Sequence, residues 1–347
     1  MSEELPWPFA GRVAGLVAGS YPLGGSYHIE HLRSELPPIA ARANALVAES
    51  TGLDLPGSPE VIVVGRRDWA ERNIAAFSLL MEPAEQRIAH RLGAVGADEL
   101  GPTVARRLVA GETGALLGVL SRRVLGQYEL VLPTGDDGDS VAFVGENILQ
   151  LERNHQFRPA EFRLWLSLHE LAHRAQFVGV PWMRVYFQDL VQEMIAVATP
   201  EPGRLRRVIG EIRERRRHGP IVDERGLFGL LASPKQSETL DRIQALMSLL
   251  EGHGHVVMDR IGRNVLTSQG RMSSILKARR ADPKLATFFR LTGIEMKMRQ
   301  YERGEQFVLS VEKRAGWSSL AAAWDGPECL PTLAEIEDAE AWLKRVA

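Results

Sequence analysis

The sequence has almost no cysteine, since Cys329 is the only one among 347 residues. An intramolecular disulfide is therefore impossible, and the fold does not depend on an oxidising compartment. The amino terminus also lacks the basic region and apolar core of a secretory signal, because it opens with acidic residues and prolines (MSEELPWPF). Together these absences predict a cytoplasmic protein.

Long apolar runs and an excess of charge of one sign are missing as well. Even residues 104–120 are interrupted by Arg106, Arg107 and Glu112, so they fall short of the roughly 18 uninterrupted apolar residues of a membrane-spanning helix. The 42 basic and 44 acidic residues give a formal net charge of -2. Such a balance provides no global field that would attract an anionic membrane or nucleic acid, and we expect neither as a partner.

One basic segment is an exception to this balance. Residues 204–219, RLRRVIGEIRERRRHG, carry many arginines, but Glu211 and Glu214 lie between them and no aromatic side chain accompanies them. Proteins that bind single-stranded nucleic acid typically combine such charge with aromatic side chains on which the bases stack. The pattern favours a solvated helix face over a nucleic-acid site.

What the sequence does contain is enough apolar material for a substantial core, with 45% hydrophobic and 25% charged residues. Most of the chain has helical periodicity, although Pro37 and Pro38 should break or kink the helix expected over 27–50, so two helices are as plausible there as one. The glycines at 114 and 118 share one helix face and could allow close packing of another helix. The short β-branched run at 60–65 predicts a strand.

The periodicity changes to two around residues 127–133 and 141–148, which flank the turn-forming residues TGDDGDS. This pattern predicts a β-hairpin. The expected fold class is therefore mainly α with a small β-hairpin or sheet, an α+β fold. The second strand, VAFVGENI, could form the rim of a cleft and pair with an extended peptide by edge addition.

The helix expected between Pro159 and Gly179 carries the H-E-x-x-H pattern at residues 169–173. On a helix His169 and His173 stand one turn apart on the same face, so both imidazoles can bind one Zn²⁺ ion. Glu170 is then placed to touch a water on that ion without being a ligand. Apolar residues surround the histidines, and burying two unpaired imidazoles would be costly.

A structural interpretation competes with this one. Arg163, Ser167, Glu170 and Arg174 form a polar stripe, so Glu170 could simply pair with Arg174 one turn further on. In that case neighbouring side chains would satisfy His169, Glu170 and His173, and no metal would be needed.

A third metal ligand has to come from elsewhere, because Gln176 and Gly179 stand where a metzincin has glycine and histidine. The segment MSLLEGHGHVVMD, 247–259, is the best source, and Glu251, His253 and His255 are all candidates. Glu251 is the preferred ligand, with His255 or His253 as an outer-shell residue or a donor to the reacting oxygen. Tyr301 is a further candidate for stabilising an oxyanion.

Several segments together resemble one known family: RRDWAERN (66–73), LGQYELVLP (125–133), VGENI (144–148), LHELAHRAQF (168–177), LLEGHGHVVMD (249–259) and MKMRQYERGEQFV (296–308). They are similar to the motifs of zincin-like hydrolases, a metalloprotease-like family widespread in actinobacteria and often labelled as associated with biosynthesis of a deazaflavin coenzyme. The resemblance implies a largely helical zincin-like fold, His169 and His173 as zinc ligands, and Glu170 as the catalytic carboxylate. It also makes the Glu251 helix the source of the third ligand.

These observations predict a zinc-dependent hydrolase in which Glu170 is the general base for a zinc-activated water. The substrate would be a peptide or a small amide or ester. The predicted organisation is one zincin-like unit over 1–347, with a helical lobe at 1–125, a metal-site core at 126–310 and a tail at 311–347 that packs on the core. The alternative is a non-catalytic protein with a structural metal that acts as a binding or scaffold module.

Overall fold

The computed structural model describes residues 5–95, 102–129, 138–197, 234–280 and 295–347. The chain forms two compact units, one of residues 1–179 with 264–268 and one of residues 180–263 with 269–347. These units divide the chain at other positions than the predicted lobes 1–125, 126–310 and 311–347, which remain a prediction. The basic segment 204–219 lies outside the described residues. Among the described helices, none is long and apolar enough to cross a membrane.

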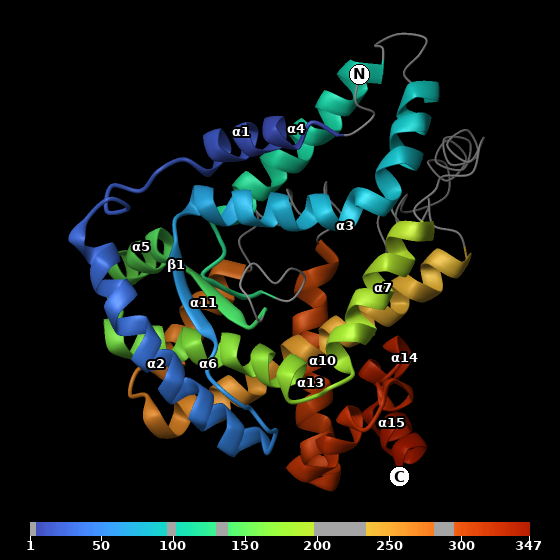
Figure 1. Ribbon diagram of the computed structural model, residues 1–347. Helices are drawn as coiled ribbons and strands as arrows, with labels where there is room; N and C mark the ends of the chain where they lie inside the picture. The colour runs from blue at the N-terminus through green and yellow to red at the C-terminus, as the bar shows by residue number, and fades with distance from the viewer. Residues whose placement is uncertain (1–4, 96–101, 130–137, 198–233, 281–294) are drawn as a thin grey trace, which may run out of the picture. The chain divides into compact units, whose positions relative to one another are not determined.

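The first unit is helical with one small sheet, as the α+β prediction requires (Figure 1). Its elements are α1 (Trp7–Ala18), α2 (Tyr27–Thr51), β1 (Glu60–Val64), α3 (Arg66–Val95), α4 (Pro102–Ser121), β2 (Gly126–Tyr128), β3 (Ser140–Val144), α5 (Gly145–His155) and α6 (Pro159–Val178).

The sheet has the strand order β1-β3-β2, so β3 is the central strand. It pairs in parallel with β1 and antiparallel with β2, with Gln127 opposite Ala142. The antiparallel pairing confirms the predicted hairpin for the described residues, whereas residues 130–137, with most of its turn, lie outside them. The described part of the first strand is 126–128, and the strand expected over 141–148 ends at Val144, where α5 begins. The idea that this strand pairs with a peptide was wrong, because both edges of β3 already carry a neighbouring strand.

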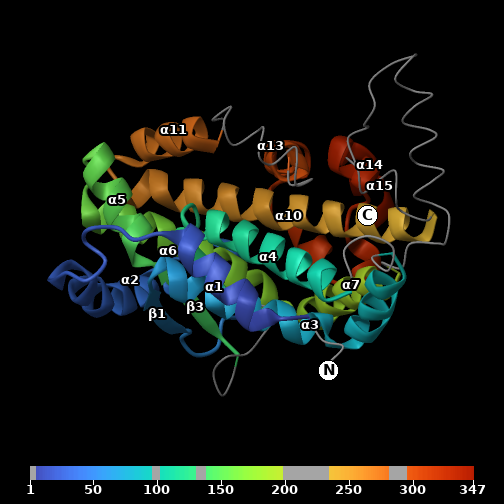
Figure 2. The same ribbon diagram turned by 90° about the horizontal axis from the view of Figure 1, so that it is seen from above.

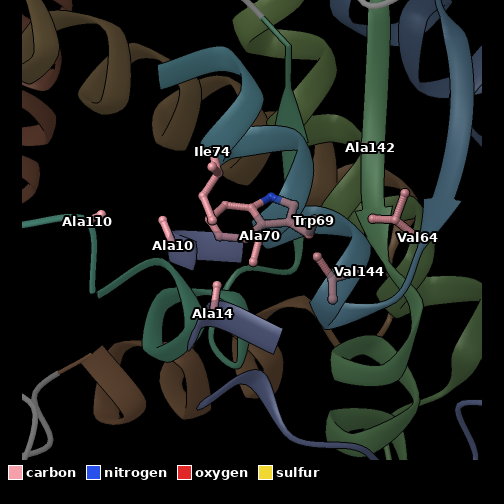
Figure 3. Packing of buried hydrophobic residues seen from close by; sticks show 9 residues of the cluster. All are labelled: Ala10, Ala14, Val64, Trp69, Ala70, Ile74, Ala110, Ala142 and Val144. Carbon is pink, nitrogen blue, oxygen red and sulfur yellow. The ribbon is translucent and has the colours of Figure 1, made fainter. Parts of the chain in front are cut away.

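Helices cover both faces of the sheet, which explains why all five residues of β3 are buried. Val64, Ala142 and Val144 point to the face that α1 and α3 cover, where Trp69 lies at the centre of an apolar cluster (Figure 3). The opposite face is covered by α2, which contacts β1, and by α6, which contacts β2. The sheet therefore serves as a rigid support for α6.

Helices α1 and α4 run side by side at backbone contact (Figures 1 and 2). A Cβ atom on Gly114 would lie 2.2 Å from the carbonyl oxygen of Ala10, and one on Gly118 would lie 2.7 Å from that of Ala14. This confirms the prediction that the two glycines allow close packing of another helix.

Helix α2 is a single helix that continues through Pro37 and Pro38. Of the two possibilities that the sequence left open, the single helix is observed, and residues on both sides of the prolines are buried: Leu32 and Leu36 before them, and Ala40 after them. Since α2 packs on α6 along this face, burial of apolar surface offsets the backbone hydrogen bonds that the prolines cannot donate.

The second unit contains α7 (Met183–Val197), α10 (Pro234–Val265), α11 (Gln269–Arg280), α13 (Glu295–Ala315), the 3-10 segments η1 (Trp317–Trp324) and η2 (Pro327–Cys329), α14 (Leu333–Glu337) and α15 (Ala339–Val346). Figure 2 shows α10 lengthwise and α13 nearly end-on, so the two helices cross steeply. At the crossing a Cβ atom on Gly252 would lie 2.1 Å from the carbonyl carbon of Gly304. Close packing therefore compensates for a glycine in the middle of α10.

The α1–α4 contact can be tested with Gly114→Ala. Alanine has the better helix propensity, but its Cβ would collide with the backbone of Ala10, which cannot move aside cheaply. We expect the free energy of unfolding to fall by about 1–3 kcal/mol, measured by urea denaturation. Gly11→Ala is the matched control, because a Cβ at Gly11 meets nothing within 4 Å. If both variants are as stable as the wild type, the contact does not matter for stability.

Candidate metal centre

Helix α6 carries the H-E-x-x-H pattern in an apolar setting. Pro159 begins the helix, as a proline at the first helical position should, and Gly179 follows its last residue. Leu168, just before His169, is completely buried, and so are Leu171 and Ala172 between the two histidines. The imidazoles of His169 and His173 are themselves only half-buried, so the apolar helix presents them at one partly open place.

The two imidazoles converge through the same type of nitrogen. The Nε2 atoms of His169 and His173 are 3.3 Å apart, and the rings stand nearly perpendicular to each other. Two nitrogens bound to one tetrahedral Zn²⁺ at about 2.0 to 2.1 Å would be about 3.3 to 3.4 Å apart. Lone pairs aimed at one point are favourable when a cation lies between them. The pair therefore fits a zinc ion.

Gln176 fixes the orientation of one of these rings. Its Oε1 lies 3.0 Å from Nδ1 of His173 and accepts the proton of that nitrogen, which leaves the lone pair of Nε2 for a metal. The side chain of Gln176 is completely buried, so this contact forms away from solvent. Gln176 thus holds the ring of His173 with its Nε2 turned toward His169.

Glu170 does not pair with Arg174. The guanidinium of Arg174 is fully buried and donates to Asp139, to Oδ1 of Asn44 and to the carbonyl oxygen of Pro56. Glu170 instead accepts a hydrogen bond of 3.1 Å from the backbone amide of Tyr128 in β2. The structural interpretation, in which Glu170 is neutralised one turn along its own helix, was therefore wrong.

The other arginine of the polar stripe is also bound away from Glu170. Arg163 donates from Nε and Nη2 to both carboxylate oxygens of Glu152 and also contacts Glu35. Although burial opposes its charge, these carboxylates leave the pKa of Arg163 raised, so it stays a cation at every ordinary pH. Both cations of α6 thus have their own anions.

The remaining predicted residues lie in the second unit. Glu251 is half-buried on α10, one residue before the crossing with α13. The ring of His253 stacks on Trp317 and meets Trp324 edge-on, which is a core position. His255 is buried one turn after Glu251. Tyr301 belongs to α13, but its side chain lies outside the described residues.

Comparison with known proteins assigns the chain to a family. A family model described as zincin-like metallopeptidase matches residues 5–343. The chain belongs to this family. Among solved structures, the zincin-like chain is similar to the crystal structure of a "putative hydrolase with a novel fold" from Chloroflexus aurantiacus, with 30% identity, a TM-score of 0.73 and 98% of each chain covered. No curated protein matches the zincin-like chain.

The family match supports the zincin-like part of the expected resemblance and a zinc ion as the metal of the family. Two contacts around this site were not expected from the sequence, that of Gln176 with His173 and that of the Tyr128 amide with Glu170. From the sequence, Gln176 only marked a departure from the metzincin pattern, which has glycine at that position. Its spacing of three residues from His173 on a helix was the signal that could have revealed it.

Replacing Gln176 tests its role as a partner of His173. We expect Gln176→Leu to weaken zinc binding by about 10- to 100-fold, because leucine cannot accept the Nδ1 proton. Gln176→Glu is the matched control, since its carboxylate keeps an acceptor in place and should preserve the affinity. Competition with a chromogenic chelator measures both. Equal affinity of the leucine variant and the wild type would show that the amide does not orient the ring.

Proposed function

We propose that the protein is a zinc-dependent hydrolase of the metallopeptidase type, with Glu170 as its general base. The observation that carries the proposal is the 3.3 Å convergence of the two Nε2 atoms, with the Glu170 carboxylate on the same helix and both arginines of α6 bound to other residues. A merely structural metal would not require a buried carboxylate next to its ligands.

Glu251 is our proposal for the third ligand. The family implies a zinc ion, and the two histidines of α6 leave room for further donors. Glu251 offers a carboxylate from a stretch of α10 that the Gly252–Gly304 crossing holds in place. Two histidines with one glutamate are a ligand set of catalytic zinc sites.

The chemistry follows from the residues around this set. A bound zinc ion would supply an activated water and polarise the carbonyl that the water attacks. Glu170 would accept the proton of the water and return it to the leaving group. We assign the outer-shell or oxyanion role to His255, because tryptophans enclose the ring of His253.

The substrate class we propose is a peptide or a small amide or ester, with cytoplasmic location and without nucleic acid or membrane as partners. The balanced net charge of -2 supports the last two points. An open endopeptidase cleft would endanger a cell from within, so we favour a narrow substrate range.

Glu170→Gln tests the general base. Glutamine keeps the size of the side chain but cannot accept the proton, so hydrolysis should fall by about a hundredfold or more while the zinc content stays at the wild-type level. A peptide-library cleavage assay with elemental analysis measures both quantities. Glu30→Gln, an exposed carboxylate on α2, is the control and should leave both unchanged. Undiminished hydrolysis by the Glu170 variant would refute the assignment.

Glu251→Ala tests the third ligand. We expect its zinc affinity to fall by more than the roughly 10- to 100-fold of an outer-shell change, because a direct bond is lost. Glu302→Ala on α13 is the control, since Glu302 is an exposed glutamate of the same unit. Full zinc affinity of the Glu251 variant, measured by isothermal titration, would move the third ligand to another residue.

A further inference from the structure

The outer edge of β2 faces Glu170. The amide of Glu129 donates to Ser140, and the amide of Val144 donates to the carbonyl of Leu125, so the backbone groups of the odd-numbered residues point toward β3. The amides of Gly126 and Tyr128 consequently point away from β3. Tyr128 uses this outward amide to donate to Oε2 of Glu170, at 3.1 Å.

Gly126 provides the space that this carboxylate occupies. A Cβ atom at residue 126 would lie 2.7 Å from both Cγ and Oε1 of Glu170 and 2.8 Å from its Cδ. The backbone of Gly126 does not adopt a positive φ, so its conformation is open to any residue. A larger residue at this position would therefore meet the carboxylate of Glu170 and not a backbone restriction.

Side chains hold β2 in place from both faces. On the α3 face, Gln127 donates to Asn73, and Glu129 accepts two hydrogen bonds from Arg72 at 2.9 and 2.6 Å. On the α6 face, the ring of Tyr128 stacks on Phe177. The strand is therefore not free to retreat from a larger residue at position 126, so Glu170 would have to move.

We propose that β2 is the positioning strand of Glu170, with Gly126 and Tyr128 as positioning residues. This inference rests on the proposed function only in taking Glu170 as the catalytic carboxylate. The Tyr128 amide holds Oε2 and so orients the carboxylate for proton transfer. The same bond occupies the amide that an extended peptide would need to pair along β2, so a substrate does not bind there unless Glu170 moves.

The Tyr128 amide reports directly on this contact. The chain has five tyrosines, so ¹⁵N-tyrosine labelling gives five amide signals, and the signal lost in Tyr128→Phe identifies Tyr128. In metal-free protein we expect Glu170→Ala to shift this signal and to accelerate its hydrogen exchange about tenfold or more. Gly126→Ala should do the same although Glu170 is present. The double variant should match Glu170→Ala alone.

Gly25→Ala is the control, because a Cβ at Gly25 meets nothing within 4 Å. It should leave the Tyr128 signal unchanged. If Gly126→Ala disturbs the other tyrosine signals as well, Glu170→Ala decides, since deleting a carboxylate cannot strain β2. Wild-type exchange at Tyr128 in Glu170→Ala would overturn the proposal.

This experiment needs neither zinc nor hydrolysis. A responsive Tyr128 amide in a protein that never hydrolyses a substrate would support the positioning strand and contradict the proposed function. An unresponsive amide in an active enzyme would support the proposed function and contradict the positioning strand.

Discussion

The hydrogen bond from the Tyr128 amide to Glu170 is the contact on which the candidate site depends. A carboxylate inside an apolar helix is expensive to bury unless a donor satisfies it. A backbone amide satisfies one oxygen and adds no charge.

Both arginines of α6 have partners other than Glu170. Arg163 is bound by Glu152, and Arg174 by Asp139, Asn44 and a backbone carbonyl, so neither reaches Glu170. Each ion pair is buried on at least one side, which makes its breakage costly. The polar stripe of α6 is therefore a set of separate contacts, in which neither arginine pairs with Glu170.

Three segments far apart in the sequence support the strand that supplies the amide. Arg66 donates from Nε to Asn147, and Asn147 donates to the carbonyl oxygens of Ser121 and Val124 just before β2. Arg72 binds Glu129 at the other end of the strand. The motifs at 66–73, 125–133 and 144–148 thus join in one polar network around the sheet. Their shared role is to fix the backbone beside α6.

The sequence by itself determined the features that depend on local periodicity. The bounds of α6, the common face of His169 and His173 and the close contact at Gly114 and Gly118 all follow from helical spacing. Strand β1 follows from a short β-branched run and β3 from a period of two, although the end of β3 at Val144 does not.

Only the tertiary structure decided which partner each polar side chain takes. Arg174 had an acidic residue one turn before it but binds Asp139, and Glu170 binds an amide 42 residues away. His253 shares a segment with Glu251 and yet lies between tryptophans. Such choices depend on which elements meet in space. A sequence pattern lists the possible donors and acceptors, whereas packing selects among them.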